Sequence, residues 1–177
     1  MIHDGLEEKS REVLVCTDEI ITLRHAHIER LGAMAAASQK HRARICVHKD
    51  ADARIQEMII LMDRSSYVCP HRHANKCESF HLIEGVADIV VFADNDEIER
   101  VIPFSLEHVF FYRLDTKRYH TIVVRSGFIV FHEVTNGPFV QDATEYAPFA
   151  PREGTNDVED YRIKLDNQIA SWLGSRQ

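Results

Sequence analysis

The sequence has few cysteines, no long apolar run and no excess of basic residues. Its four cysteines form neither a C-x-x-C pair nor the framework of a disulfide-rich domain. No apolar stretch approaches the roughly 20 residues that a membrane-spanning helix needs. The first residues also lack the apolar core of a signal peptide. These features predict a cytoplasmic protein with reduced thiols and no membrane segment.

The charge balance is acidic and argues against two further classes of protein. Asp and Glu number 28 against 21 Lys and Arg, which gives a formal net charge of −7. A general nucleic-acid binder would present a basic face, and anionic membranes attract basic segments. We therefore expect a small-molecule ligand, with no nucleic-acid partner and no membrane partner.

The chain is rich in short strand-like runs and long enough for one packed domain. A chain of 177 residues buries roughly 70% of the surface that it exposes when unfolded. Runs of Ile, Val, Phe and Tyr separated by turn residues fill residues 44–140 and predict an antiparallel β-sandwich or β-barrel. Apolar spacing predicts a helix over 18–39 within an N-terminal segment 1–43, and a second helix within a C-terminal segment 141–177. Both segments are expected to belong to the same domain as the barrel.

Histidine is unusually frequent, and its densest group lies in residues 71–81. His71 and His73 would point to one face of a strand, because side chains alternate along a strand with a period of two. A tight turn over 74–77 would bring Glu78 back on the neighbouring strand. Two imidazoles and one carboxylate that converge in this way are typical ligands of a divalent transition metal. The alternative is a solvated strand whose histidines bind nothing.

The spacing H-x-H-x(4)-E-x(6)-G over His71, His73, Glu78 and Gly85 resembles the first motif of the cupin superfamily, the small double-stranded β-helix barrels. The resemblance implies a mainly β fold, a jelly-roll barrel with the two helices packed outside it. It also implies that the two histidines and the glutamate are metal ligands and that Gly85 lies at a turn. The motif of the family begins with a glycine where this chain has Ser65, and the neighbouring Asp and Ser residues still favour a turn there.

A fourth ligand is expected from a later strand, and His120 has a suitable position. The second cupin motif usually surrounds its histidine with Pro, Gly and Asn, which this chain lacks, so the assignment rests on spacing. If Ser126 and Gly127 form a hairpin turn, His120 lies opposite Glu133, and both face the barrel interior. A buried carboxylate needs a partner, so we expect Glu133 to contact His120, the metal or the substrate.

Strand alternation separates other candidates from this site. His81 and His132 are turned away from it, so neither is expected to bind metal. Cys69 falls on the side that faces the metal, where we interpret it as a small buried residue rather than a ligand or a redox group.

Further stretches resemble the WbuC family of bacterial cupin-fold metalloproteins, which is associated with lipopolysaccharide O-antigen gene clusters. The matching stretches lie between residues 41 and 154 and include S-Y-V-C-P-H-R-H and H-E-V-T-N-G-P-F. The chain departs from the family at Cys69, where Arg or a similar residue is expected, and in its longer N-terminal leader. The resemblance implies a metal site and leaves the reaction open.

Polar residues outside the metal motif supply candidates for substrate binding and proton transfer. Arg42, Arg44 and Arg152 are candidates for holding an anionic substrate, because a guanidinium binds carboxylate or phosphate through two hydrogen bonds. Surface salt bridges are the alternative for each arginine. Glu133 and His48 are the candidate general bases.

A site of three histidines and one glutamate is compatible with three functions. We favour an isomerase or epimerase that acts on a small sugar or keto acid of bacterial polysaccharide biosynthesis, with the metal as a Lewis acid. An iron-dependent dioxygenase is the second, because such a site leaves positions open for substrate and oxygen. A non-catalytic cupin that binds a small molecule is the third. The expected ion is Fe, Mn, Ni or Zn, and a homodimer is expected because cupins often pair through sheet edges.

Overall fold

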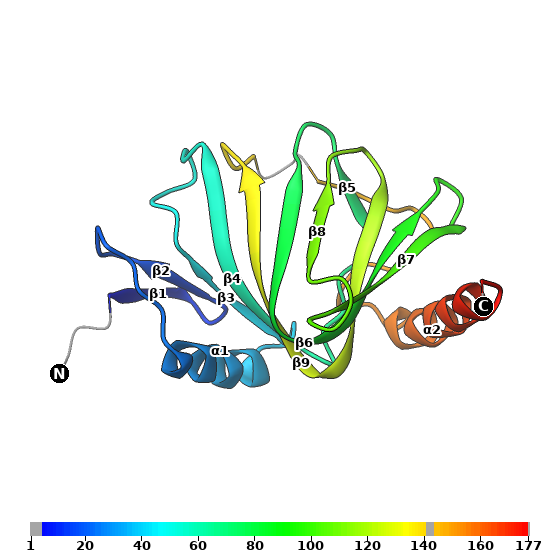
Figure 1. Ribbon diagram of the computed structural model, residues 1–177, viewed down its shortest axis with the longest axis horizontal. Helices are drawn as coiled ribbons and strands as arrows, with labels where there is room; N and C mark the ends of the chain where they lie inside the picture. Colours follow the sequence, from blue (N-terminus) through cyan, green and yellow to red (C-terminus); the bar gives the residue numbers. More distant parts are fainter. Residues whose placement is uncertain (1–4, 141–143, 177) are drawn as a thin grey trace.

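The computed structural model describes residues 5–140 and 144–176. A rolled β-sheet forms the body of the molecule, and two helices lie outside it (Figure 1). The strands are β1 (Leu6–Ser10), β2 (Val13–Cys16), β3 (Arg42–Cys46), β4 (Ile55–Asp63), β5 (His71–His73), β6 (Glu78–Phe92), β7 (Ile98–Ser105), β8 (Phe111–Leu114), β9 (Tyr119–Asn136) and β10 (Thr144–Tyr146). The helices are α1 (His25–Ala37) and α2 (Val158–Gly174). Within the described ranges, no helix is long and apolar enough to cross a membrane.

Two long strands, β6 and β9, form the frame of the barrel. They pair antiparallel over nearly their whole length, with two register shifts where β6 bends. Gly85 lies at this bend with a φ of 91°, and a Cβ at that position would collide with the carbonyl oxygen of Phe128. Only glycine tolerates both conditions. Gly85 therefore lies inside a bent strand and not at the turn that the motif implied.

The hairpin predicted at Ser126 and Gly127 is wrong, because residues 119–136 form one continuous strand. One half of β9 pairs with β5 and the end of β6, and the other half pairs with β4 and the start of β6. The bend at Ser126 and Gly127 shifts the side-chain alternation by one residue. Val124 before it and Ile129 after it consequently point into the same core. The interior face was predicted correctly, although the geometry behind it is a bend.

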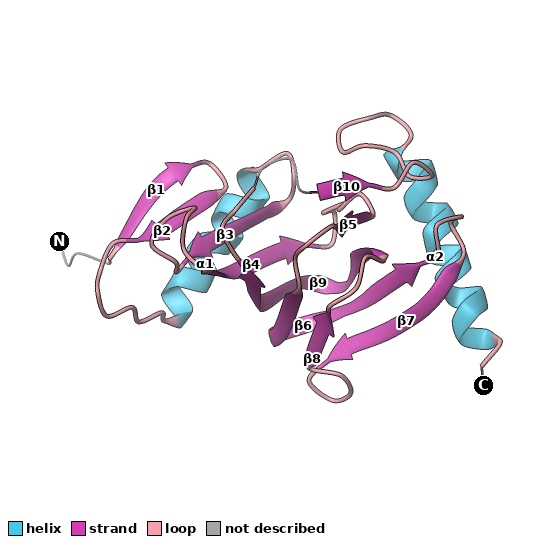
Figure 2. Cartoon of the chain, turned by 90° about the horizontal axis from the view of Figure 1, so that it is seen from above, coloured by secondary structure: helices cyan, strands magenta, loops and turns pink. Residues whose placement is uncertain are grey.

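Both helices cover outer faces of the sheet, on opposite sides of the molecule (Figure 2). Helix α1 packs Leu31 and Ala35, four residues apart, against β3 and β4. Helix α2 packs Leu165 and Ile169 against a second outer cluster that includes Val90 of β6. Full burial of one Leu or Ile side chain contributes roughly 1.5–3 kcal/mol. These apolar stripes fix the helices to the barrel, as the sequence predicted.

The N-terminal segment differs from the helical segment expected over 1–43. Its described part begins with the β1–β2 hairpin, and β2 adds to the sheet parallel to β3. Helix α1 starts at His25 instead of residue 18, because Ile20 and Ile21 are exposed and supply no packing to hold a helix there. Residues 1–4 of the predicted N-terminal segment, and residues 141–143 and 177 of the C-terminal one, lie outside the described residues.

Candidate metal centre

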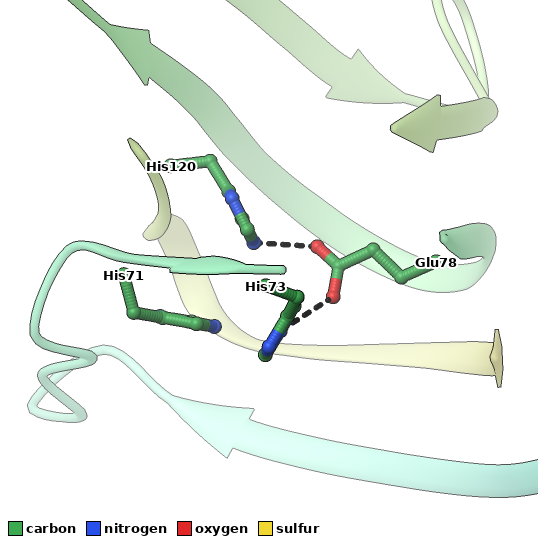
Figure 3. A group of neighbouring side chains, drawn as sticks. All are labelled: His71, His73, Glu78 and His120. Carbon is green, nitrogen blue, oxygen red and sulfur yellow. Dashed lines mark ion pairs between the residues drawn. The ribbon is translucent and has the colours of Figure 1, made fainter. Parts of the chain in front are cut away.

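Four side chains from three strands meet inside the barrel (Figure 3). His71 and His73 come from β5, Glu78 begins β6, and His120 lies near the start of β9. One ligand atom from each lies within 4.8 Å of the others. His71 and His120 are direct partners across β5 and β9, and strand alternation puts His73 on the same side. In the described part of the chain, β5 and β6 do not pair with each other. Both pair with β9, which therefore positions Glu78 relative to the histidines of β5.

Each of the three histidines is held through its Nδ1 atom. His71 and His120 each donate Nδ1–H to the backbone carbonyl two residues earlier in the chain, at 3.0 Å in both cases. His73 Nδ1 lies 3.3 Å from the hydroxyl of Thr144 on β10, within hydrogen-bond distance. Such contacts fix the orientation of a ring and leave Nε2 for a ligand, which is the usual arrangement around a protein metal ion.

The unpaired atoms at the centre fit a divalent cation. Glu78 Oε1 lies 2.6 Å from His120 Nε2, and Glu78 Oε2 lies 3.5 Å from His73 Nε2. Although the first distance is short, the angles are not those of a hydrogen bond, and both atoms are buried without a hydrogen-bond partner among the described residues. Ligands about 2.1 Å from one ion and at right angles to each other lie about 3 Å apart. The spacing of these atoms is therefore compatible with ligands of a common ion.

Burial and the charges of neighbouring side chains set the pKa values of this cluster. Burial lowers the pKa of His71 to about 4, with a further contribution from the charge of His120. Burial alone would raise the pKa of Glu78, but the neighbouring histidines, His120 first among them, together lower it and keep the carboxylate ionised. In turn, Glu78 raises the pKa of His120 against the effect of burial. A cation bound at this point would displace the proton of His120, as metal ligation requires.

Glu133 borders the same cavity, which has a volume of about 270 Å³. It lies opposite Phe80, two residues along the sheet from the Glu78–Thr135 pair. Glu133 and Glu78 are thus diagonal neighbours on one face, with Cα atoms roughly 7–8 Å apart. The predicted pairing of Glu133 with His120 is wrong, because His120 lies on the other half of β9. Both residues reach one cavity because the strand is bent.

The surroundings of Glu133 favour its protonated form. Burial and then repulsion from Glu78 raise its pKa to about 7, although Lys76 and Arg44 act in the opposite direction. Its carboxyl group therefore exchanges a proton near neutral pH, which suits a general acid or base.

The comparisons with known proteins concern mainly the fold. A family model described as a domain of unknown function, DUF6016, matches residues 23–103. No curated protein matches the sequence. Among solved structures, CapF with the inhibitor 3-isopropenyl-tropolone superposes with a TM-score of 0.50 at 17% identity, over 59% of this chain and 31% of CapF. A cupin 2 conserved barrel domain protein from Rhodopseudomonas palustris gives a TM-score of 0.48 at 15% identity, over 73% of this chain and 77% of that one. This chain shares the fold of the part of CapF that it matches. It spans less than a third of the length of the CapF chain.

In this barrel, the raised pKa of Glu133 predicts a pH-dependent effect on stability. A carboxyl group with a folded-state pKa above its unfolded value of 4.5 destabilises the protein as pH rises from that value through about 7. For metal-free protein, we compare the free energy of unfolding of Glu133→Gln with that of wild type. Between pH 5 and pH 8 the difference should shift in favour of the variant by at most about 2.5 kcal/mol. Water in the cavity makes this an upper value. Urea unfolding at the two pH values measures the gain.

Glu145→Gln is the matched control for this experiment. Hydrogen bonds from Arg72 and then Tyr119 lower the pKa of Glu145, so its transition lies below pH 4.5. The difference between this variant and wild type should stay constant from pH 5 to pH 8. An equally constant difference for Glu133→Gln would contradict the assignment of its pKa.

The structure distinguishes the two arginines on β3. Arg42 donates to both carboxylate oxygens of Glu153 at 2.8 Å and to the carbonyl of Tyr67 at 2.9 Å, although it also borders the metal cavity. The salt-bridge alternative therefore describes Arg42. Arg44 borders the metal cavity as well, and no carboxylate of the described residues lies within ion-pair distance of it.

Two other candidates lie apart from the metal cavity. His48 Nδ1 accepts the backbone N–H of Glu57 at 3.0 Å, and His48 borders a second cavity instead. The guanidinium of Arg152 stacks 3.7 Å above the ring of Tyr146. Within the described residues, Arg152 borders neither cavity. The structure thus brings together the four predicted metal ligands, Glu133 and Arg44, and it does not bring His48 or Arg152 to them.

The remaining sequence candidates lie outside the metal cluster, and two residues near the site were not predicted. His132 lies 3.4 Å from Glu57 and His81 is exposed, and neither belongs to the four-residue cluster found in the described chain. Cys69 is fully buried, which agrees with its interpretation as a core residue. Sequence reasoning missed Lys76, which borders the metal cavity from within the H-x-H-x(4)-E motif. It also missed Thr144, whose contact with His73 spans 71 residues of sequence and leaves no local signal.

Proposed function

We propose that this cupin is a divalent-metal-dependent isomerase or epimerase that acts on a small anionic sugar or keto acid. The observation that carries the proposal is the position of Glu133, whose carboxyl group lines the cavity that also holds three histidines and Glu78. Residues His71, His73, Glu78 and His120 would hold the ion. When bound, a divalent ion supplies a Lewis acid that polarises a carbonyl or hydroxyl group.

Glu133 would carry the proton in this reaction. Its carboxylate would remove a proton from the carbon next to a carbonyl group and return it to a neighbouring atom of the substrate. A pKa near 7 lets one group act as both acceptor and donor. Because a single carboxyl group works from one face of the substrate, this arrangement suits isomerisation best.

The cellular context is part of the proposal and rests on the resemblance to the WbuC family. Stretches that resemble this bacterial family extend from residue 41 to residue 154 and include the metal motif. We place the substrate among the precursors of bacterial polysaccharides on this basis. Arg44 supports an anionic substrate, because its charge has no ion-pair partner among the described residues.

Hydrogen exchange from solvent tests the reaction even while the product is unidentified. Protein loaded with Mn²⁺, Zn²⁺ or Fe²⁺ is incubated without oxygen in D₂O with a panel of 2-keto acids, keto sugars and their phosphate esters. We expect deuterium at the carbon next to the carbonyl group of at least one compound, with more than one metal, by NMR. Oxygen uptake that requires iron would replace the proposal with a dioxygenase. Absence of turnover with every loaded form would favour a binding protein.

A further inference from the structure

The metal cavity opens onto a second, larger cavity of about 770 Å³. Residues of four strands and of the loop between β5 and β6 border both spaces, among them Arg44 and Glu133 on strands and Lys76 in the loop. The β1–β2 hairpin supplies part of the outer wall through Lys9 and Val15. The two cavities are therefore adjoining compartments of one site, with Arg44, Lys76 and Glu133 at their junction.

The sizes of the compartments differ in a way that bears on the substrate. Pockets for small molecules usually measure about 300–1,000 Å³. The metal cavity, at about 270 Å³, lies just below this range and has room for a small ligand or for one end of a larger one. The larger compartment has the size of a complete ligand site. A substrate that fills both has a small reactive end and a larger remainder.

The charge at the junction is positive, although the protein as a whole carries −7. Arg44 and Lys76 both border the two compartments, and no carboxylate of the described chain lies within ion-pair distance of either. Lys9 and Lys49 border the larger compartment as well, where Lys9 is paired with Glu7 at 2.7 Å and Asp50 adds a negative charge. Arg44 and Lys76, which have no such partner, favour an anionic ligand at the junction.

The position of Arg44 is firmly set by the sheet. Its backbone lies in the middle of β3, opposite Val13 of β2 on one side and Ile60 of β4 on the other. Ile60 in turn lies opposite Phe131 of β9, two residues from Glu133. The Arg44 side chain therefore extends from the central part of the sheet, on the same face as Glu133. The planar guanidinium can donate two parallel hydrogen bonds to the oxygens of a phosphate.

We propose that Arg44 and Lys76 bind the phosphate group of a phosphorylated substrate, with its carbonyl end in the metal cavity and its remainder in the larger compartment. This inference rests on the proposed function for the role of the metal cavity. Two cations at one point suit the several oxygens of a phosphate group better than the two oxygens of a carboxylate. The substrate class is accordingly a phosphate ester of a sugar or keto acid.

Titration calorimetry with inorganic phosphate tests the binding site directly. We expect phosphate to bind metal-loaded wild-type protein, and Arg44→Ala/Lys76→Ala to weaken that binding at least tenfold. Arg100→Ala/Lys117→Ala removes the same two charge types from exposed positions outside both cavities, and it should bind like wild type. Acetate, as a carboxylate probe, should bind more weakly than phosphate.

Two further measurements separate this inference from the proposed function. His71→Ala should lose metal and still bind phosphate, and the metal content of Arg44→Ala/Lys76→Ala should match wild type. If the double alanine variant does not fold, Arg44→Gln and Lys76→Gln, each alone, give the same comparison. Phosphate affinity that is undetectable in wild type, or unchanged by loss of Arg44 and Lys76, overturns the phosphate site. Loss of metal-dependent exchange alone would overturn only the proposed reaction.

Discussion

Replacing His120 by alanine is expected to remove most of the bound metal from the purified protein. His120 supplies one of four converging ligand atoms, and its removal also leaves Glu78 buried with His73 as its only remaining ion-pair partner among the described residues. Loss of residues that only support metal ligands already costs about 10–100-fold in affinity, so we expect at least about a hundredfold loss here. Elemental analysis after loading with Mn²⁺ or Zn²⁺ and dialysis measures the effect. His71→Ala and His73→Ala should behave in the same way.

His132→Ala provides the control on the same strand. Its side chain lies beside Glu57 and outside the cluster, so the metal content should match wild type. His81→Ala, at an exposed position of β6, should also retain its metal. Full metal occupancy in His120→Ala would show that the fourth ligand has been assigned wrongly. Equal losses in all five variants would point to unfolding in place of a ligand effect.

Glu133→Gln is expected to slow deuterium exchange into the substrate by about 10²–10⁴-fold, the usual contribution of a positioned acid or base. Glutamine keeps the shape of the side chain and removes the carboxylate that accepts and returns the proton. Because Glu133 lies apart from the four converging ligand atoms, the variant should keep its metal. The rate follows from NMR under anaerobic conditions, with elemental analysis of the same samples.

A pH profile adds a readout that a structural role for Glu133 would not change. The wild-type exchange rate should depend on the ionisation of a group, and this dependence should disappear in Glu133→Gln. Glu84→Gln, on an exposed position of β6, should leave both the rate and the profile unchanged. Rapid exchange in Glu133→Gln, with the wild-type pH profile, would assign the proton transfer to another group.

The parts of the site that follow from local spacing could be predicted from the sequence. His71 and His73 share a face because strands alternate, and Glu78 follows after a short connection. The sequence placed Glu133 in the interior by assuming a hairpin at Ser126 and Gly127, where the structure has a continuous, bent strand. The apolar residues on both sides of Ser126 and Gly127 face one core, and a bent strand satisfies that pattern as well as a hairpin does.

The parts that depend on distant contacts could not be predicted. The partner of Arg42 is Glu153, which lies 111 residues away, so its charge gave no indication that it was already paired. The first strand, with the sequence LEEKS, is mostly exposed and carries no alternation of apolar residues. Its pairing with β2 became visible only in the fold, and with it the wall of the larger compartment.

The short strand β5 has a consequence for the effect of a bound metal ion. It supplies two of the four converging side chains, yet it contains three residues and joins β9 through a single residue pair. The β6–β9 frame is long and does not depend on β5 for its own pairing. β5 is otherwise held by its three residue pairs with β10. A bound ion would therefore add a direct link between β5 and the two long strands, through the side chains of His71 and His73 on one side and Glu78 and His120 on the other.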